Sequence, residues 1–281
     1  MSKLNISSKD QISYERAKED EPYELGGDSL IKTGVEKGTL LDRCLTDSKI
    51  YPGVCHKYKI YISANYDNST PTSLIIFLDG HSYIKHANAP VVLDNLISKG
   101  DIPPTIAVFL EPGDKGPGLP IYGGNDNRSF EYDKADSQFV SFLEKELLSL
   151  IEKEYLITTD AKKRIICGFS SGGIAAFNAA WNRPDLFGNV ISHSGSFIAI
   201  RGGEVFPTLI RKENKKSLKI WMSAGKKDLN IVFGDLKQAN EYMASSLEYM
   251  GYEYQFHLTE GGHNLKYGSS MLPETLRWIF N

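Results

Sequence analysis

Two adjacent serines with glycines on both sides lie in the stretch RIICGFSSGGIAAF, residues 164–177. The stretch opens on a β-branched run typical of a strand and closes on small residues typical of a buried helix. We therefore expect a sharp strand-to-helix turn between them. A serine on such a turn, a nucleophile elbow, presents its hydroxyl for attack on a carbonyl carbon. The alternative is a glycine-rich turn whose serine only caps the helix. The flanking strand and helix favour the nucleophile.

The spacing of the glycines distinguishes the two serines. In a nucleophile elbow the residues two before and two after the nucleophile approach each other closely, so both must be small. Ser170 has Gly168 and Gly172 at these positions, whereas Ser171 would place Phe169 in the crowded one. We therefore predict that Ser170 is the nucleophile. Ser171 is expected to point its backbone N–H at the oxyanion that forms on the substrate.

A serine hydroxyl needs a base to take its proton and an acid to orient that base. Behind a nucleophile elbow the acid comes next along the chain and the histidine last. Two of the six histidines lie late enough, His257 and His263. His257 falls inside a strand pattern, whereas His263 lies in the following loop TEGGHN, so His263 is predicted to be the base. The other histidines precede any acid loop: His56, His81, His86 and His193.

Three carboxylates compete to orient His263. Asp228 lies a few residues beyond the strand pattern LKIWMSA, on a loop expected at the same sheet edge as Ser170. Asp235 is typical of an N-cap for the helix that follows it. Glu260 is so near His263 in sequence that reaching the far ring nitrogen would strain the loop. We favour Asp228 as the acid.

A second oxyanion donor is expected in the turn after the strand pattern SLIIFLD. There the chain reads Asp79, Gly80, His81 and Ser82, and the glycine permits the turn. The backbone N–H of His81 is expected to be free to face the site. The His81 imidazole is an alternative catalytic group, but the backbone role is favoured.

Seven short runs rich in Ile, Val, Phe and Tyr predict strands. Most central runs are apolar on both faces, which is typical of a parallel sheet covered by helices on both sides. The first two expected strands lie too close in sequence for a helix between them, so this edge is expected to be antiparallel. The pattern predicts a three-layer αβα sandwich with a mostly parallel central sheet. The expected strands span 58–64, 73–79, 105–111, 164–168, 189–194, 218–224 and 252–258.

Amphipathic stretches between the strands predict the covering helices. We expect residues 1–281 to form one α/β domain, with residues 1–50 as an N-terminal extension packed on it or trailing from it. The Gly- and Pro-rich segment 111–128 is expected to be a long surface loop. The expected helices span 90–100, 136–155, 174–181, 236–251 and 272–280.

Composition and charge favour a globular protein with a small-molecule partner. Of the 281 residues, 41% are hydrophobic and 24% are charged, and the formal net charge is −3. No basic stripe is present, which disfavours nucleic acid and membrane surfaces as partners. The N-terminus lacks the apolar core of a signal peptide, and no apolar run approaches the roughly 20 residues that span a bilayer. We expect a cytoplasmic protein and leave a homo-oligomer open.

Cysteine usage and the known ligand motifs predict neither a metal nor a cofactor. Cys44, Cys55 and Cys167 are too few and too scattered for a disulfide framework or a zinc site, so we expect buried or idle thiols. Neither a phosphate-binding loop nor a dinucleotide fingerprint occurs in a fitting context.

Taken together, these segments resemble the Putative esterase group of α/β-hydrolases, which includes enterochelin (siderophore) esterases, feruloyl esterases and the mycolyl-transferring antigen 85 proteins. The similarity runs from about Asp28 to the C-terminus. It rests on SKIYPG, FLDGHSY, NRSFEYD, GFSSGGIAAF, AAWNRPDLFG, SGSF, RGGEVFPTLIRK, AGKKDLN and EGGHN, in this order. The resemblance implies an α/β-hydrolase fold with a catalytic triad and a two-amide oxyanion hole. The triad maps onto Ser170, Asp228 and His263, and the oxyanion hole onto the amides of His81 and Ser171.

Three residues are candidates for the wall of the acyl pocket. Arg128 opens the segment RSFEYD, and Phe197 and Arg201 lie in SGSFIAIRGGEVF, after the carboxyl end of a strand. Two arginines near the site would suit an anionic or catechol-like substrate. The alternative is that each arginine forms a structural ion pair, Arg128 with Glu131 or Asp133 and Arg201 with Glu204.

Three functions of different class fit the pattern. The favoured one is a serine carboxylic-ester hydrolase that works through an acyl-enzyme on small acyl esters or on aromatic esters of the hydroxycinnamoyl or catechoyl type, free or linked to carbohydrate. An acyltransferase would use the same triad with a sugar or alcohol in place of water. A non-catalytic binding module would keep the fold alone. The complete triad and the two oxyanion amides weigh against the third.

Overall fold

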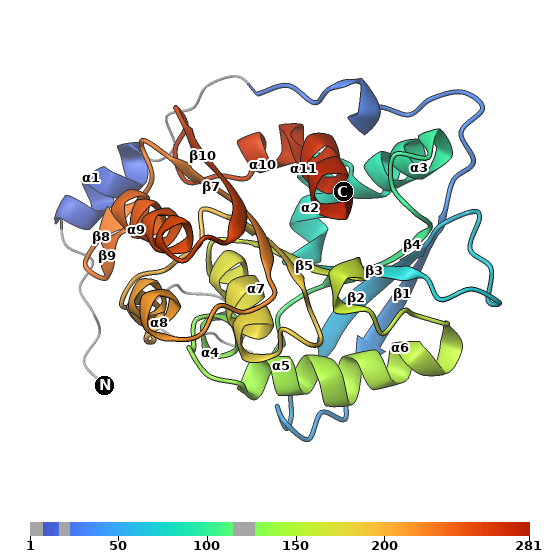
Figure 1. Cartoon of the computed structure of the whole chain (residues 1–281), viewed down its shortest axis with the longest axis horizontal. Coiled ribbons are helices and arrows are strands. Elements are labelled where there is room, and N and C mark those ends of the chain that lie inside the picture. The colour runs from blue at the N-terminus through green and yellow to red at the C-terminus, as the bar shows by residue number, and fades with distance from the viewer. Residues whose placement is uncertain (1–7, 17–22, 115–126) are drawn as a thin grey trace.

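An eight-stranded sheet forms the centre of the molecule (Figure 1). The computed structural model describes residues 8–16, 23–114 and 127–281. The strands lie side by side in the order β1-β2-β4-β3-β5-β6-β7-β10. Their bounds are β1 (Thr39–Leu45), β2 (His56–Ile62), β3 (Ser73–Leu78), β4 (Thr105–Leu110), β5 (Arg164–Phe169), β6 (Asn189–His193), β7 (Lys219–Gly225) and β10 (Glu253–Thr259). A separate antiparallel pair, β8 (Asn230–Ile231) and β9 (Gly234–Asp235), lies between β7 and the next helix.

The direction of the strands follows the sequence prediction. From β4 to β10 every neighbouring pair is parallel. Strand β2 pairs antiparallel with both β1 and β4. All seven expected strands are present within two residues of their predicted ends. The mostly parallel sheet and its antiparallel edge are therefore confirmed.

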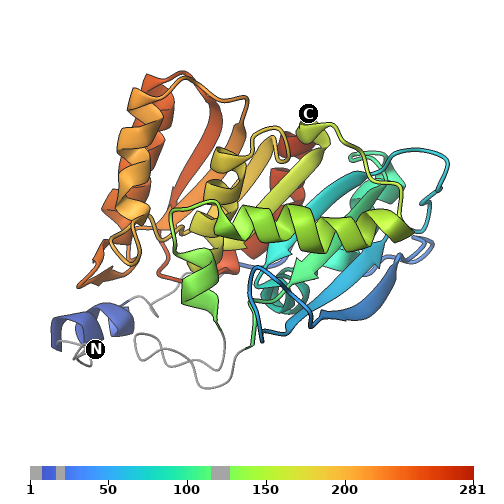
Figure 2. The ribbon, with the colours of Figure 1, turned by 90° about the horizontal axis from the view of Figure 1, so that it is seen from below.

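Helices cover both faces of the sheet, which confirms the three-layer sandwich. One core lies between the sheet and α2, α3 and α11, where Phe77, Phe109 and Trp221 of the strands meet Leu93 and Leu276 of the helices. A larger core lies under the helices of the opposite face, and Figure 2 shows the long helix of residues 138–154 running across that face. The helices are α1 (Ser8–Arg16), α2 (Gly80–Ala87), α3 (Ala89–Lys99), α4 (Arg128–Tyr132), α5 (Gln138–Phe142), α6 (Ser149–Glu154), α7 (Ser171–Asn182), α8 (Phe206–Lys212), α9 (Leu236–Tyr249), α10 (Lys266–Ser270) and α11 (Leu272–Phe280).

The expected helix 136–155 is present but is not uniform along its length. Its middle, Leu143–Leu148, has π-helical hydrogen bonding and joins α5 to α6. The apolar face read from the sequence is buried, including Phe139 and Phe142. A π-helical turn within an α-helix is uncommon and leaves no trace in a 3.6-residue hydrophobic pattern.

The segment expected to be an N-terminal extension contributes a strand. Residues 39–45 form β1 and pair along their whole length with β2, from Thr39 opposite Ile62 to Leu45 opposite His56. Because β1 is an edge strand with most of its side chains at least partly exposed, it lacks the continuous apolar run that marks the central strands. Of the predicted N-terminal extension, residues 39–45 therefore belong to the central sheet.

The expectation of three unpaired thiols is wrong for two of them. Cys44 at the end of β1 and Cys55 just before β2 form a disulfide, with their Cα atoms 6.6 Å apart. The antiparallel pairing of β1 with β2 brings the two together, and the sequence alone does not reveal that register. Cys167 is a buried free thiol, as expected. Because disulfides persist mainly in oxidising compartments, this pairing does not support the cytoplasmic location, which stays a prediction.

Both ends of the expected loop 111–128 are tied to one buried carboxylate, while residues 115–126 lie outside the described residues. Glu131 accepts hydrogen bonds from the Gly113 N–H and from the Asn127 side-chain amide, at 3.2 Å each. The ring of His56, on β2, lies 3.0 Å from the same carboxylate. This buried cluster fixes where the chain leaves β4 and where it re-enters at α4.

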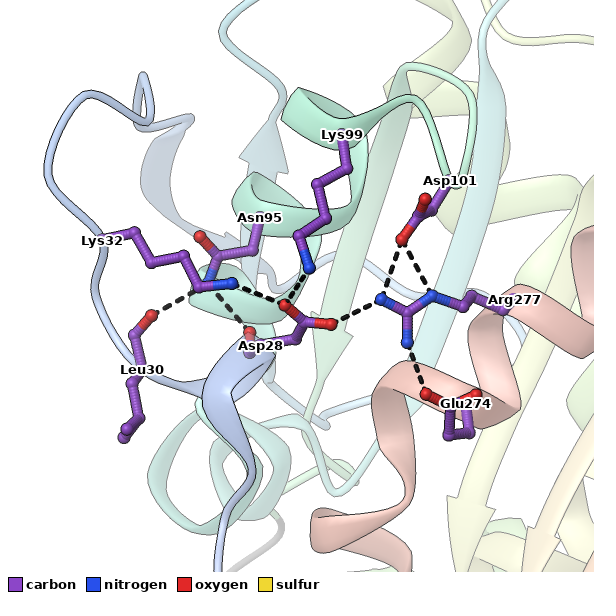
Figure 3. Close-up of polar contacts among 8 residues, drawn as sticks. All are labelled: Asp28, Leu30, Lys32, Asn95, Lys99, Asp101, Glu274 and Arg277. Atoms are coloured by element: carbon purple, nitrogen blue, oxygen red, sulfur yellow. Dashed lines mark hydrogen bonds and ion pairs between the residues drawn. The ribbon is translucent and has the colours of Figure 1, made fainter.

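The N-terminal segment is tied to the body of the protein by a cluster of charges around Asp28. The Asp28 carboxylate accepts hydrogen bonds from Lys32 at 2.6 Å, from Lys99 of α3 at 2.5 Å and from Arg277 of α11 at 2.5 Å (Figure 3). Arg277 also bonds Asp101 at 2.8 Å. The Asn95 side chain donates to the backbone of the same segment. One carboxylate therefore joins three parts of the chain.

The cationic partners of Asp28, first Lys32 and then Lys99 and Arg277, hold the pKa of this carboxyl well below its usual range. A carboxyl whose pKa is lower in the folded than in the unfolded state stabilises the fold above the unfolded pKa, about 3.9, and loses that contribution as pH falls through the folded pKa. We expect Asp28→Asn to lower the free energy of unfolding by about 1 kcal/mol at pH 7, because solvent screens much of the attraction in a partly exposed cluster. The deficit should shrink below about pH 4. Urea unfolding at several pH values measures it, with the exposed Asp47→Asn as control. A deficit that stays constant with pH would contradict the role of this charge.

Candidate active site

The chain turns from strand to helix at Ser170. This residue lies between the end of β5 and the first residue of α7, with φ 58° and ψ −121°. A positive φ is unfavourable for a residue with a side chain and persists only where the surroundings enforce it. The Ser170 N–H donates to the His193 carbonyl at 2.9 Å, and its carbonyl accepts from the Ser196 N–H at 3.1 Å. The strained turn is thus held from the neighbouring strand β6.

The small residues on either side of Ser170 are required by the geometry of this turn. A Cβ atom added to Gly168 would lie 2.1 Å from the carbonyl oxygen of Gly172, a distance that no side chain can occupy. A Cβ atom on Gly172 would lie 2.9 Å from a carboxylate oxygen of Asp79. The close approach from which the sequence analysis selected Ser170 over Ser171 is therefore present.

A chain of hydrogen bonds links Ser170 to two later loops. His263 Nε2 lies 2.9 Å from Ser170 Oγ, and His263 Nδ1 lies 2.6 Å from Asp228 Oδ1. Asp228 follows β7 and His263 follows β10, so both loops leave the carboxyl edge of the sheet at which β5 also ends. The Phe169 ring packs beside the His263 ring, with centroids 4.8 Å apart. The structure brings together all three residues proposed as a triad.

The Asp228 carboxylate is fixed by its own loop. Its side chain is fully buried, whereas that of His263 is 14% exposed. The Leu229 N–H donates to Asp228 Oδ1 at 2.8 Å. A buried carboxylate held in this way orients the imidazole and favours the tautomer with its proton on Nδ1.

The two competing carboxylates have other partners. Asp235 accepts the Gln238 N–H at 3.0 Å and caps α9, as predicted. Glu260 pairs with Lys226, on an exposed part of the surface. His257, the histidine rejected as base, lies on β10 and stacks on Trp221 at 4.4 Å. Within the described residues, no hydrogen bond joins any of these three side chains to Ser170 or His263.

The two amides proposed as oxyanion donors differ in their surroundings. Ser171 is the first residue of α7, where backbone N–H groups have no acceptor within the helix and favour a negative charge. The His81 N–H, in contrast, already donates to Glu111 Oε1 at 2.6 Å. The expectation that this amide is free is therefore wrong, because it has a side-chain acceptor. Glu111 directly follows β4, the neighbour of β3, so the contact depends on a strand order that the sequence does not state.

Arg128 connects the two turns that carry these amides. Its guanidinium donates two hydrogen bonds to Asp79, at 2.8 and 2.7 Å, and a third to the Phe169 carbonyl at 3.2 Å. Burial opposes the charge on Arg128, but the Asp79 carboxylate outweighs burial and raises the pKa of the guanidinium. The alternative role predicted for Arg128, a structural ion pair, is therefore present. Its partner is Asp79, and not Glu131 or Asp133 as the sequence suggested.

The other two acyl-pocket candidates contact residues outside the relay. Phe197 is 2% exposed and packs edge-on against Phe177 and Phe206 in the core. Arg201 lies over the Phe130 ring at 4.2 Å and donates to Ser129 Oγ at 3.1 Å, so the alternative pairing with Glu204 is not the contact present. A substrate role for either residue stays a prediction.

One neighbour of the nucleophile was not identified from the sequence. Ser196 Oγ lies 3.3 Å from Ser170 Oγ, and the Ser196 side chain is buried. The segment SGSF was used for the family resemblance and for its phenylalanine, and no role was predicted for Ser196. A small polar residue just after the strand next to the elbow is the signal that could have pointed to it.

The described residues contain neither a cluster of metal-ligating side chains nor a helix with the length and apolar character needed to span a membrane. Within them, no group of three or more His, Cys, Asp or Glu side chains has the arrangement of a metal site. Searching those same residues for a helix that could cross a bilayer finds none.

The family described as Putative esterase matches residues 53–279 of this chain, a span that includes the whole relay. The chain belongs to this family. The match starts just before β2 and ends in α11, so it covers all of the sheet except β1. The expected resemblance is confirmed.

Two proteins of similar sequence are distant relatives of this chain. The chain is 24% identical over 236 residues to the iron(III) enterobactin esterase of Dickeya dadantii, covering 78% of this chain but 50% of that protein. It is 23% identical over 225 residues to the uncharacterized protein YjcH of Bacillus subtilis, covering 78% of this chain and 88% of YjcH. The chain therefore spans about half the length of the enterobactin esterase and most of the length of YjcH.

Solved structures show the same fold. The ferulic acid esterase AmCE1/Fae1A of Anaeromyces mucronatus superposes with a TM-score of 0.72 at 17% identity, covering 92% of this chain and 98% of that one. The enterobactin esterase FES of Shigella flexneri superposes with a TM-score of 0.68 at 20% identity, covering 85% of this chain and 59% of that one. The α/β-hydrolase fold is confirmed.

The contact between Asp228 and His263 leads to a test of whether Asp228 is the acid that orients the histidine. Asp228→Asn should reduce kcat for p-nitrophenyl acetate by about 10⁴, because the asparagine amide stabilises the wrong imidazole tautomer. Glu260→Gln and Asp235→Asn, which remove the two competing carboxylates, should have little effect. Steady-state kinetics of the three variants measures this, and a larger loss in Glu260→Gln than in Asp228→Asn would move the acid to the loop of His263.

Proposed function

We propose that this protein is a serine carboxylic-ester hydrolase that works through an acyl-enzyme. The observation that carries the proposal is the unbroken hydrogen-bonded relay from Ser170 through His263 to the buried Asp228. Membership of an esterase family and the fold shared with ferulic acid and enterobactin esterases support it. The strained backbone at Ser170 supports the assignment of the nucleophile, because such strain collects at functional sites.

The relay accounts for both halves of the reaction. His263 Nε2 takes the hydroxyl proton as Ser170 Oγ attacks the ester carbonyl carbon, while Asp228 stabilises the imidazolium that forms. The carbonyl oxygen becomes an oxyanion, for which the Ser171 N–H at the start of α7 is one donor and the His81 N–H the other. His263 then gives its proton to the departing alcohol oxygen, which leaves the acyl group on Ser170. Water, deprotonated by the same imidazole, releases the acid and restores the serine.

Small acyl esters and aromatic esters are the proposed substrates. A ferulic acid esterase is among the proteins of the same fold, and an iron(III) enterobactin esterase is among the sequence relatives. An ester oxygen leaves with modest help from a protonated imidazole, whereas an amine needs a well-aligned proton transfer. We therefore propose esters rather than amides, and a soluble small-molecule or carbohydrate-linked ester as the partner.

The serine variants test the proposed function. Ser170→Ala should lower the turnover of p-nitrophenyl acetate and butyrate by about 10⁶, as expected when a triad serine is lost, while the unfolding curve stays close to that of the wild type. Ser171→Ala is the matched control, since the role assigned to Ser171 belongs to its backbone N–H and the variant keeps it. Equal losses in the two variants, or ester hydrolysis that survives in Ser170→Ala, would contradict the proposal.

A further inference from the structure

The amide that the proposed mechanism needs from His81 already has an acceptor within the protein. Glu111 Oε1 accepts the His81 N–H at 2.6 Å, a short bond of the kind that a charged acceptor makes. The position of Glu111 is fixed from its own backbone, since its N–H donates to the Lys57 carbonyl of β2 at 2.9 Å. The backbone from which this carboxylate reaches the His81 amide is therefore held in place.

A substrate oxyanion and the Glu111 carboxylate compete for one donor. A backbone N–H aims its hydrogen in one direction, so it cannot serve both acceptors well. An ionised carboxylate at that point would also repel the negative charge that develops on the substrate oxygen. The two effects act together against the transition state for as long as Glu111 stays in place.

We propose that Glu111 gates the oxyanion hole: its carboxylate holds the His81 amide, and an ester reacts only after that side chain has left the amide. The proposal rests on the proposed esterase function and adds a residue that sets its rate and its specificity. Glu111 thereby acts through the His81 amide and not as a catalytic residue of the relay.

The surroundings of Glu111 make the gate easy to release. Burial raises the pKa of the Glu111 carboxyl above its usual value, and the His81 N–H bond offsets this only in part. Among the charged groups that face it, Asp79 also raises the pKa, while His81 and Arg128 lower it. The Arg128 guanidinium forms an ion pair with Asp79, so its positive charge stabilises the Glu111 carboxylate less than an unpaired cation would. A carboxylate that burial already disfavours costs less to protonate or displace.

A pocket beside Glu111 indicates which substrates would open the gate. A hollow of about 680 Å³ lies between α2 and the β1-β2-β4 edge, and its wall is mainly apolar. Ile84 and Phe109 line it, together with Glu111 and His81. The charged side chains of the β1 and β2 edge also border it, namely those of Asp42, Arg43, Lys57 and Lys59. Its volume suits a small organic group. An apolar part of an ester lying there would remove water from Glu111 and oppose its charged form further.

The isosteric variant Glu111→Gln tests the gate. Glutamine keeps the size of the side chain but brings no negative charge, so its amide oxygen makes a weaker hydrogen bond to the His81 N–H and yields this donor more easily to the substrate. Since one oxyanion donor is worth about 10²–10³ in kcat, we expect a partial gain, about tenfold in kcat/KM for p-nitrophenyl acetate. Phenylboronate, whose tetrahedral adduct on the serine carries a negative charge, should bind more tightly by a similar factor. Glu260→Gln, which neutralises an exposed carboxylate held by Lys226, is the matched control and should behave as the wild type.

Chain length separates the gate from a structural role. In the wild type, going from acetate to butyrate should raise kcat as well as lower KM, because the longer acyl group helps to displace Glu111. In Glu111→Gln the gain in kcat should disappear and only the gain in KM should remain. A variant damaged in its fold would lose activity on both esters alike.

Several results would overturn the proposal. It fails if Glu111→Gln and Glu111→Ala fold as the wild type does and hydrolyse esters no faster, or bind phenylboronate no more tightly. It fails also if a crystal structure of the wild type carrying a phosphonate on Ser170 still shows the Glu111 carboxylate on the His81 amide, a measurement that needs no variant. Ester hydrolysis that depends on Ser170 but not on Glu111 would reject the gate alone. Wild-type protein without any Ser170-dependent ester hydrolysis would reject the proposed function and the gate together.

Discussion

The backbone of Ser170 is the point from which the rest of the site is built. A residue with a side chain is held at positive φ between β5 and α7, and this is tolerated because two glycines let the chain pass within contact distance of itself. The conformation costs on the order of 1–3 kcal/mol, which the surrounding structure has to offset. Hydrogen bonds from Ser170 to the chain on either side of the β6 turn, at His193 and Ser196, hold it there. The same geometry places the hydroxyl 2.9 Å from His263 Nε2, at the start of α7.

A parallel sheet supplies the partners of that serine. Because β5, β7 and β10 run in the same direction, the loops after them emerge at one edge of the sheet. Ser170, Asp228 and His263 meet at that edge, although Ser170 and His263 are 93 residues apart in the sequence. The neighbouring strands β3 and β4 bring His81 and Glu111 to the same edge. The ion pair between Arg128 and Asp79 ties the turn after β3 to the elbow. The chemistry is thus positioned by strand order, and the helices mainly bury the two faces of the sheet.

How far the sequence predicts this site depends on whether a feature is local or reaches across the chain. The elbow at Ser170 could be predicted because its steric demand falls on residues two positions away. The helix cap at Asp235 and the buried central strands could be predicted for similar reasons. Contacts between distant segments could not: the Cys44–Cys55 disulfide needs the register of β1 with β2, and the Glu111 contact needs β4 beside β3. Strand β1 itself has the half-exposed pattern of an edge, which resembles a surface loop in a single sequence.

The central claim is that Ser170 alone is the activated nucleophile, and covalent labelling tests it most directly. The protein is incubated with p-nitrophenyl ethylphosphonate, which reacts with serines activated by a neighbouring base, and the adduct is located by peptide mass spectrometry. We expect one adduct per chain, on Ser170, and much slower labelling when His263 is replaced by alanine. An adduct on Ser171 or Ser196, or ester hydrolysis that continues in protein with Ser170 fully modified, would contradict it.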